Sequence, residues 1–469
     1  MNSRTRGARA VVRLAMLVTI GSAVVLPTVA LPTSSSAAGM RPTSGARPSK
    51  LGAGANLRPG QTLVSPGGRY ILEMDKDGNL SLTWLGRLVW ATNTMGHDGA
   101  ILSMQRDGNL VVYFGKRALW SSRTGGRPMA KYSLSMLADG NIVITAPSGA
   151  LIWSSRSETA GVRIVPEGSP AYDGDAGDPD VVRSGSEYYA FTTGTPLGNH
   201  IQALVSSTPA SGWHSYTGKT YGSTALPYTP SWEAPNTQTS PGVFLYDKHW
   251  VMFYDATLAG HSQGTGYDCI SVATATTLTP NHPAFTDNSR GPLICQGQFG
   301  GVLDPTPFIN PSTNKAYVLW KSNDGSSWQA SHIWSQELNA AGTGVVGSPT
   351  LLLTNNTVRF PWESTLDDPS MANANGRDFL MFSVGSYVSS SYAEAFASCR
   401  GPSGPCTQPA GKPFLTTYSH AYGPGGGSLF TEAAGNWWIS YAAWRSSTCQ
   451  SYSCGGSRVL YVAPIDLGG

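Results

Sequence analysis

Aspartates that stand directly before a proline recur in the C-terminal two thirds of this chain of 469 residues. Asp178, Asp304 and Asp368 each precede a short apolar stretch that is typical of a strand. Because proline fixes its own backbone, such a step is a rigid way to aim a short acid. Hydrolysis of a glycosidic bond requires one protonated carboxyl for the leaving oxygen and one ionised carboxyl that activates water or attacks the anomeric carbon. Asp178 and Asp304, at equivalent positions in the pattern, are therefore candidates for this chemistry.

The segments around these aspartates form a repeat. Each opening leads into an apolar strand, a polar turn and a second, aromatic strand, which is the pattern of a β-meander. Successive openings are 56 to 70 residues apart and stand at Asp178-Pro179, Ala234-Pro235, Asp304-Pro305, Asp368-Pro369 and Gly426-Gly427. A period of this length, made only of short strands, indicates a propeller with one sheet per blade. We predict an all-β chain in which residues 161–469 form a five-bladed β-propeller, with the openings gathered at its central channel.

The composition limits the possible partners. Charged residues make up only 13% of the chain, the net charge is +3, and no basic run follows the N-terminal segment. Nothing in the chain would therefore gather a polyanion by counterion release, and nucleic acid is not expected as a partner. We expect a secreted, turn-rich monomer.

Six cysteines lie in the C-terminal two thirds of the chain, and pairing between neighbours would close three small loops. Disulfides of this kind form in an oxidising exterior. A metal site is the alternative, but no pair has the Cys-x-x-Cys spacing and no histidine cluster accompanies them. We therefore expect disulfides, with no metal and no cofactor. The cysteines are Cys269, Cys295, Cys399, Cys406, Cys449 and Cys454.

The N-terminus has the layout of a secretory signal, with four arginines, then the apolar run LAMLVTIGSAVVL, then small residues. We assign residues 1–38 to a signal peptide, with cleavage after Ala38 or Ala30, and expect an extracellular protein. An uncleaved anchor helix is the alternative reading of this segment. Residues 39–55 are rich in Ser, Pro, Gly and Ala and should form a flexible lead.

A second, shorter repeat occupies residues 56–157. The sequences DKDGNLSL, QRDGNLVVY and LADGNIVIT are each followed, 11 or 12 residues after the Asn, by Trp90, Trp120 and Trp153. Each unit reads as a strand, an Asp-Gly-Asn turn, an alternating strand and a strand ending on a tryptophan. Three such units can pack their tryptophans into one shared core, so we predict a threefold β-prism.

This segment resembles the bulb-type mannose-binding lectins, whose sugar motif is Gln-x-Asp-x-Asn-x-Val-x-Tyr. The second repeat carries the whole motif as Gln105, Asp107, Asn109, Val111 and Tyr113. Alternate residues of a strand face one way, so the polar groups can meet sugar hydroxyls while the valine packs on the pyranose face. The resemblance implies one site for a mannose-type glycan. The alternative, turn chemistry alone, is preferred for the other two repeats, which depart from the motif at Asp75, Ser81, Thr83, Leu137 and Thr145.

The propeller segment resembles glycoside hydrolase family 43. The resemblance rests on Gly177-Asp178-Pro179, on Asp304 before an apolar and an aromatic strand, and on the stretches WEAP, YAEAFASCRGPSGPC and GPGGGSLF. It implies that Asp178 is the general base and that Asp304 tunes and orients the acid. The family's general acid is a Glu two residues before a Pro, a position held here by Asp367. Glu363 is the alternative acid, although Trp362-Glu363 more closely matches a Trp-Glu pair upstream of it.

The resemblance also implies a function. We expect an inverting glycosidase acting on arabinose- or xylose-containing polysaccharides, with the prism as a glycan-targeting module. Trp232 and Trp362 lie close to blade openings and could stack on sugar rings. Gly426 and Ala442 stand where many relatives place a channel histidine, so no bound ion is expected. The rival hypothesis is a two-module carbohydrate-binding protein with an inactive propeller.

Overall fold

A computed structural model describes residues 47–157, 161–194, 200–216, 224–279, 284–322 and 330–468. The predicted signal peptide, with both cleavage positions, and most of the predicted lead lie outside these residues. Residues 47–469 form one compact unit. Its regular structure consists of β-strands and two single-turn 3-10 helices. Among the described residues, no helix has the length and apolar character needed to cross a membrane.

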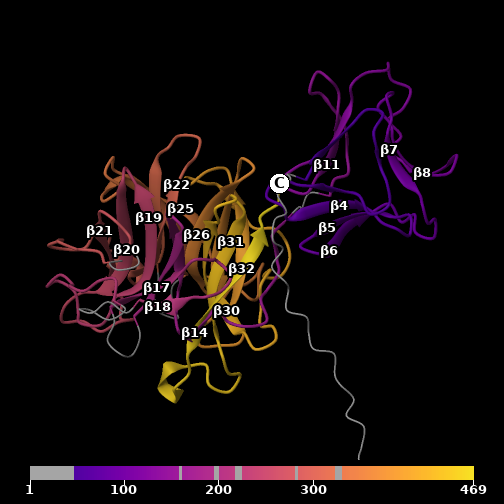
Figure 1. The fold of residues 1–469 in the computed structure, drawn as a ribbon. Helices are drawn as coiled ribbons and strands as arrows, with labels where there is room; N and C mark the ends of the chain where they lie inside the picture. The colour runs from indigo at the N-terminus through magenta and orange to yellow at the C-terminus, as the bar shows by residue number, and fades with distance from the viewer. Residues whose placement is uncertain are drawn as a thin grey trace, which may run out of the picture. The chain divides into compact units, whose positions relative to one another are not determined.

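The N-terminal part is the predicted β-prism, made of three four-stranded sheets and drawn in indigo and purple in Figure 1. The half-buried Trp90, Trp120 and Trp153 meet edge to face, with ring centroids 5.7 and 5.8 Å apart, as the repeat predicts. The sheets are β3 (Thr62–Val64), β4 (Tyr70–Met74), β5 (Leu80–Trp84) and β6 (Arg87–Ala91); β2 (Asn56–Leu57), β7 (Ile101–Met104), β8 (Leu110–Phe114) and β9 (Arg117–Ser121); and β1 (Lys50–Gly52), β10 (Ser133–Met136), β11 (Ile142–Thr145) and β12 (Leu151–Ser154).

The C-terminal part is a propeller of five antiparallel sheets. Blade 1 contains β15 (Asp180–Ser184), β16 (Glu187–Thr193), β17 (Ile201–Ser206) and β18 (His214–Ser215), and blade 2 contains β19 (Thr239–Tyr246), β20 (His249–Thr257) and β21 (Asp268–Ala275). Blade 3 contains β22 (Val302–Ile309), β23 (Ala316–Ser322), β24 (His332–Leu338) and β25 (Val345–Thr354), and blade 4 contains β26 (Leu366–Ala374), β27 (Arg377–Val384), β28 (Ala393–Cys399) and β29 (Cys406–Thr407). Blade 5 contains β30 (Tyr422–Thr431), β31 (Trp437–Trp444) and β32 (Arg458–Asp466).

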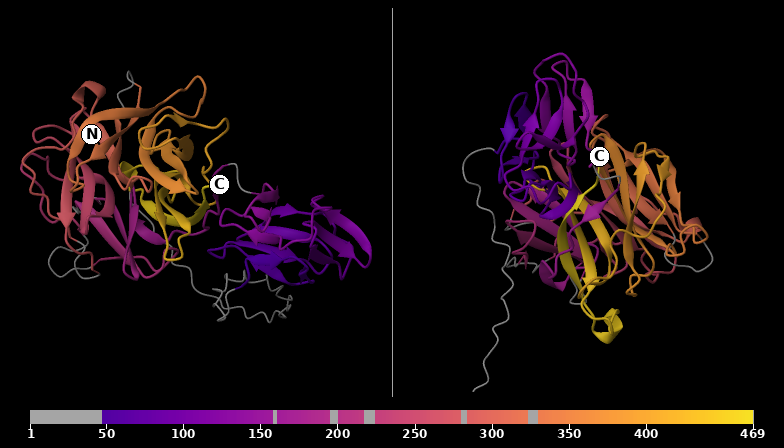
Figure 2. Two further views of the ribbon diagram at one scale, coloured as in Figure 1. Left: turned by 90° about the horizontal axis from the view of Figure 1, so that it is seen from above. Right: turned by 90° about the vertical axis from the view of Figure 1, so that its right-hand side faces the viewer.

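Blade 5 closes the ring. Two strands that precede blade 1 in the sequence, β13 (Arg163–Ile164) and β14 (Tyr172–Asp175), both pair with β32. Inner strands β15 and β30 of the first and last blades are in contact, and Figures 1 and 2 show the yellow strands of blade 5 beside the magenta strands of blade 1. The first strands after the prism therefore complete the last blade.

A β-bulge opens the inner strand of blades 2, 3 and 4. The pairing register shifts between Thr239 and Gly242, between Leu303 and Thr306, and between Asp367 and Ser370. Bulges re-aim a side chain by bending the strand. In each case the bulge contains the residue before a proline, so the Asp-Pro steps mark a real structural feature.

The opening of blade 2 differs from the prediction. It is Ser240-Pro241, within β19, and not Ala234-Pro235. Ala234 lies before that strand, and its N–H donates to the Thr257 carbonyl at the end of β20. The sequence misled because both dipeptides end in proline, and only the one inside the strand forms the bulge.

The cysteines form the three neighbour pairs that the sequence predicts. Cys269 bonds to Cys295, Cys399 to Cys406, and Cys449 to Cys454. The last two bonds close loops of only a few residues, with sequence separations of 7 and 5.

Candidate active site

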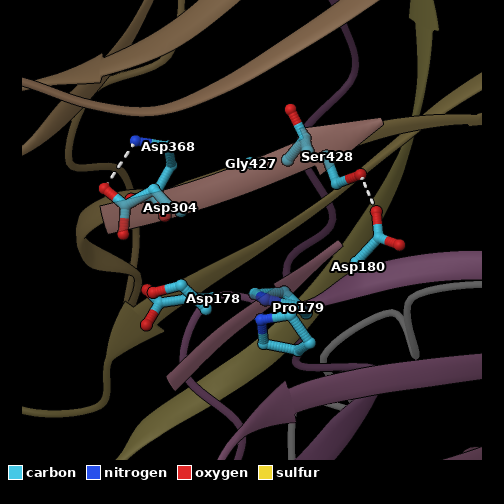
Figure 3. Close-up of a pocket in the computed structure, with 11 residues that line it drawn as sticks. Asp178, Pro179, Asp180, Asp304, Asp368, Gly427 and Ser428 are labelled. Atoms are coloured by element: carbon cyan, nitrogen blue, oxygen red, sulfur yellow. Dashed lines mark hydrogen bonds between the residues drawn. The ribbon is translucent and has the colours of Figure 1, made fainter. Parts of the chain in front are cut away.

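Equivalent residues from all five blades line one pit at the propeller channel. These residues are Asp178, Ser240, Asp304, Asp368 and Gly426. All five have left-handed backbones, with φ angles between 46° and 69°. This region costs an L-residue roughly 1–2 kcal/mol, so it persists only where the surrounding structure holds it. The bulges of blades 3 and 4 and the turn before β15 thus bring three aspartates from separate blades to one pit, where Figure 3 shows Asp178, Asp304 and Asp368.

Side chains of the preceding blade hold these strained positions. Each accepts a hydrogen bond from the backbone N–H of a pit residue, which fixes the bulge before any ligand binds. The pairs are Thr193 Oγ1 with Ser240 (3.1 Å), Asp255 Oδ1 with Asp304 (3.1 Å), Asp304 Oδ2 with Asp368 (3.0 Å) and Ser383 Oγ with Gly426 (2.8 Å).

Asp178 is the cation-paired carboxyl of the pit. Its Oδ1 accepts from Arg458 Nη1 at 2.6 Å, and its Oδ2 accepts from Thr193 Oγ1 at 2.7 Å. The Arg458 side chain is only 4% exposed. Burial alone would lower the pKa of Arg458, but the neighbouring Asp178 raises it overall. The Asp178 carboxyl therefore lies beside a permanent cation.

Asp304 and Asp368 face Asp178 across the pit (Figure 3). Burial raises the pKa of Asp304 to about 6, although Lys321 opposes the shift. Burial also raises the pKa of Asp368 well above its usual range, and the nearby Asp304 and Asp178 charges add to the rise. Tyr392 donates to Asp368 Oδ2 at 2.8 Å. Asp368 accordingly keeps its proton to a higher pH than an ordinary aspartic acid.

The structure places the predicted acid Asp367 differently. Its buried carboxylate pairs with Lys321 Nζ at 2.5 Å, and it is absent from the pit lining. The reason is the bulge, which turns Asp368 into the channel and leaves Asp367 facing the neighbouring blade 3. Asp367 is still close enough to the pit to act on it, because its charge helps to raise the pKa of Asp304 and of Asp368.

Glu363, the other predicted acid, lies outside the pit lining. Its buried carboxyl accepts from the Asn356 N–H at 2.7 Å and from Gln408 Nε2 at 2.5 Å. These bonds tie together two loops of the chain. The structure therefore places Glu363 at a position that supports the loops.

The predicted stacking residues are also elsewhere. Trp232 packs against the core shared by blades 1 and 2 and donates to Ser289 Oγ at 2.9 Å. Trp362 donates to the Gly411 carbonyl and lines a separate cavity with Phe396. Neither lines the pit.

Two residues that the sequence analysis did not select surround the pit. Arg458 comes from β32, and Glu394 comes from β28, behind the pit residue Gly427. A Cβ on Gly427 would lie 2.5 Å from Glu394 Oε1, so only glycine leaves room for this carboxyl. Burial raises the pKa of Glu394 to about 7, and its buried Oε2 has no hydrogen-bond partner among the described residues. The sequence does contain a signal for Glu394, because a Glu interrupts the apolar pattern of the strand in YAEAF.

The pit has a volume of about 20 Å³, which is room for one water molecule. Its walls combine carboxyl oxygens with glycine and proline backbone. Among the described residues, no group of three or more His, Cys, Asp or Glu side chains is arranged to hold a metal ion. A water held between an anionic and a protonated carboxyl is the arrangement that glycoside hydrolysis with water as nucleophile needs.

In the prism, the Asp-Gly-Asn turns share one hydrogen-bond pattern. The Asp Oδ1 accepts the N–H of the Asn two residues on, in all three repeats. What sets the second repeat apart is the contact of Gln105 Nε2 with the Tyr113 hydroxyl at 3.0 Å. Val111 is 1% exposed, so its side chain is buried.

A family model for glycosyl hydrolases family 43 matches residues 168–468, which include all five blades. The chain belongs to glycosyl hydrolases family 43. It is therefore a glycosidase that hydrolyses O-glycosyl bonds. Within the family 43 domain, the pit is the place where carboxyls of different blades converge.

Solved structures share the family 43 fold. A thermostable family-43 glycoside hydrolase is 20% identical over 62% of this chain and 89% of its own, with a TM-score of 0.52. An endo-1,4-β-xylanase from Bacteroides thetaiotaomicron is 20% identical over 64% of this chain and 96% of its own, with a TM-score of 0.50.

A monomeric mannose-binding lectin from Gastrodia elata is 43% identical over 23% of this chain and 96% of its own, with a TM-score of 0.22. No curated protein gives a significant match.

Proposed function

We propose that the protein is an inverting glycosidase acting on arabinose- or xylose-containing polysaccharides. The observation that carries the proposal is the unequal pairing of the pit carboxyls. The Asp178 carboxyl forms an ion pair with Arg458. Among the described residues, no cation is hydrogen-bonded to the Asp368 carboxyl. Environments that push two carboxyls apart in pKa define an acid and a base.

In the proposed reaction, the Asp178 carboxylate accepts a proton from water as the water oxygen attacks the anomeric carbon. The bond to the leaving glycosidic oxygen breaks, and Asp368 gives that oxygen its proton. The product sugar has the opposite anomeric configuration, because one displacement has taken place. Asp304 lies beside Asp368, accepts the Asp368 N–H, and raises the pKa of Asp368 by its charge.

The substrate class rests on two observations. The family resemblance implies arabinose- or xylose-containing glycans, and one structure that shares the fold is a xylanase by its title. The pit itself holds only carboxyls, glycines, prolines and small hydroxyl residues. Its lining therefore suits a neutral sugar.

Turnover of arabinotriose and xylotriose tests the proposal. Wild-type protein should cleave at least one of them, and the product should appear first as the inverted anomer in a proton NMR time course. Asp178→Asn should lose roughly a thousandfold or more in rate, since the water then lacks its base. Full turnover by Asp178→Asn would overturn the assignment, and a wild-type protein that binds both sugars without cleaving either would favour the binding-protein alternative.

We further propose that the protein is secreted and that the second prism repeat binds a mannose-type sugar. The N-terminal signal pattern and the three disulfides support secretion. The Gln105–Tyr113 pair supports the sugar site. Tyr113→Phe removes the hydroxyl and should weaken retention on mannose-agarose, whereas Thr83→Ala, at the matching position of the first repeat, should not. Equal retention of both variants and wild type would contradict the site.

A further inference from the structure

Two loops rise from the pit end of blades 4 and 5. Residues 385–392 follow β27, whose last residue, Val384, pairs with Leu366 at the start of the inner strand. Residues 445–457 follow β31, whose last residue, Trp444, pairs with Tyr422 at the start of β30. Both loops therefore stand on the face that carries the pit. The second one projects beyond its blade and is the yellow loop with a short helical turn in Figure 1.

The first loop carries an exposed aromatic ring beside the pit. Tyr387 is 47% exposed, and its ring centroid lies 5.8 Å from Arg458 Cζ. The same guanidinium contacts Asp178 through Nη1 at 2.6 Å. One residue, Arg458, thus connects the exposed Tyr387 ring to the proposed base.

The second loop supplies another ring at the same place. Tyr452 is 37% exposed and packs edge to face on Trp444 with ring centroids 5.2 Å apart. Its hydroxyl lies 3.4 Å from the point where a Cβ on Gly177 would stand, and Gly177 is the residue before Asp178. The Cys449–Cys454 disulfide closes the segment that holds Tyr452.

The two loops are joined to each other. Trp444 is fully buried and donates from Nε1 to the Tyr387 carbonyl at 2.5 Å. This bond anchors the backbone beneath Tyr387, and the disulfide limits the freedom of the opposite loop. Both rings are therefore held in place before substrate arrives, which reduces the ordering cost of binding.

Large aromatic rings left exposed beside a polar catalytic pit need a reason, because their burial would be favourable. The pit has room for little beyond the reacting atoms. We propose that Tyr387, supported by Tyr452, forms an aromatic subsite that stacks on the C–H face of the pentose next to the bond being broken. The inference rests on the proposed function, and it specifies an oligosaccharide chain as the ligand.

Binding to a protein that cannot turn over tests the subsite. Asp178→Asn protein is titrated with arabinotriose and xylotriose by calorimetry, with and without Tyr387→Ala. Loss of the ring should lower the affinity for the more tightly bound trisaccharide by roughly three- to tenfold. Tyr387→Phe should keep the wild-type affinity, because the ring and not the hydroxyl makes the contact. Equal affinities with and without Tyr387→Ala, or no trisaccharide binding by either protein, would overturn the subsite.

Two controls show whether a loss of affinity comes from the Tyr387 ring itself or from damage to the fold. Tyr246→Ala removes a half-buried tyrosine at the far end of β19, and it should leave trisaccharide affinity unchanged. A thermal melt of each variant shows whether it is folded. Failure of the proposed function would appear in a different measurement, as a wild-type protein that binds both trisaccharides without cleaving either, and would leave the affinity comparison intact.

Discussion

The buried Arg458 and the largely covered Asp178 form an ion pair, 2.6 Å from Nη1 to Oδ1, between the last strand of the propeller and the opening of its first blade. Arg458 begins β32, the strand that also pairs with β14 just before Asp178. The contact that closes the ring is therefore the one that holds the proposed base. Stability and activity should both depend on it.

Replacing Arg458 by Met should be costly because the Asp178 carboxyl, whose side chain is only 18% exposed, would lose its cation. Breaking a buried pair in this way destabilises proteins by about 3–5 kcal/mol, which urea unfolding will measure. The activity should fall as well, since the Asp178 carboxyl would lose the Arg458 hydrogen bond that positions it. As a control, Lys315→Ala removes an ion pair with Glu337 whose partners are 55% and 32% exposed, and it should leave the unfolding midpoint unchanged. A tolerated Arg458→Met would contradict the role of the pair.

The pH dependence of turnover should follow the proton on Asp368. Its raised pKa means that the acid keeps its proton to a higher pH than an ordinary aspartic acid and loses it as the pH rises further. The value of kcat/KM should accordingly fall on the alkaline side, and Asp368→Asn should remove that alkaline limb together with most of the activity. An alkaline limb that persists unchanged in Asp368→Asn would assign it to another group.

Glu394 should make the stability of the protein depend on pH. Its pKa of about 7 in the folded protein lies above the unfolded value of about 4.3. Between these values the folded state binds a proton that the unfolded state lacks, so the unfolding free energy contributed by this group falls as the pH rises toward 7 and is then constant. Glu394→Gln should therefore gain stability relative to wild type between pH 5 and about pH 7. The prediction would be refuted if the difference in melting temperature between the two proteins did not change across this pH range.

Gly427 and Glu394 should show coupled effects. Gly427→Ala puts a methyl group 2.5 Å from Glu394 Oε1, which neither side can accept without movement of the pit wall. The variant should lose activity, and adding Glu394→Ala should recover part of it, since contacting residues are not additive. Gly168→Ala is the control, because Gly168, like Gly427, has no positive φ, and no atom lies within 4 Å of the added methyl. Equal loss in the single and double variants would show that the clash is not the cause.

The architecture could be predicted from local sequence signals. The repeated Asp-Pro steps and aromatic strands indicated the blades, the tryptophan spacing indicated the prism, and Asp178 and Asp304 were correctly placed at a common channel. Proline marks these positions because it follows the bulge residue itself. The same signal misplaced the second opening at Ala234, where a proline lies in the turn before the strand.

The detail of the pit could not be predicted in the same way. Whether Asp367 or Asp368 enters the channel depends on a register shift of one residue, and such a shift turns a side chain to the other face. The Asp-Pro rule favoured Asp368, while alignment by resemblance favoured Asp367. Arg458 and Glu394 reach the pit from outer strands, where no local pattern shows which side chains point inward.

The leaving-group dependence of the acid variants tests the central claim most directly. An enzyme without its general acid should still cleave a dinitrophenyl pentoside, whose leaving group needs no proton, while failing on xylotriose or arabinotriose. We predict this split for Asp368→Asn, with smaller and uniform losses for Asp367→Asn and Glu363→Gln. The account would be contradicted if Asp368→Asn lost both activities equally or if the split appeared in Asp367→Asn.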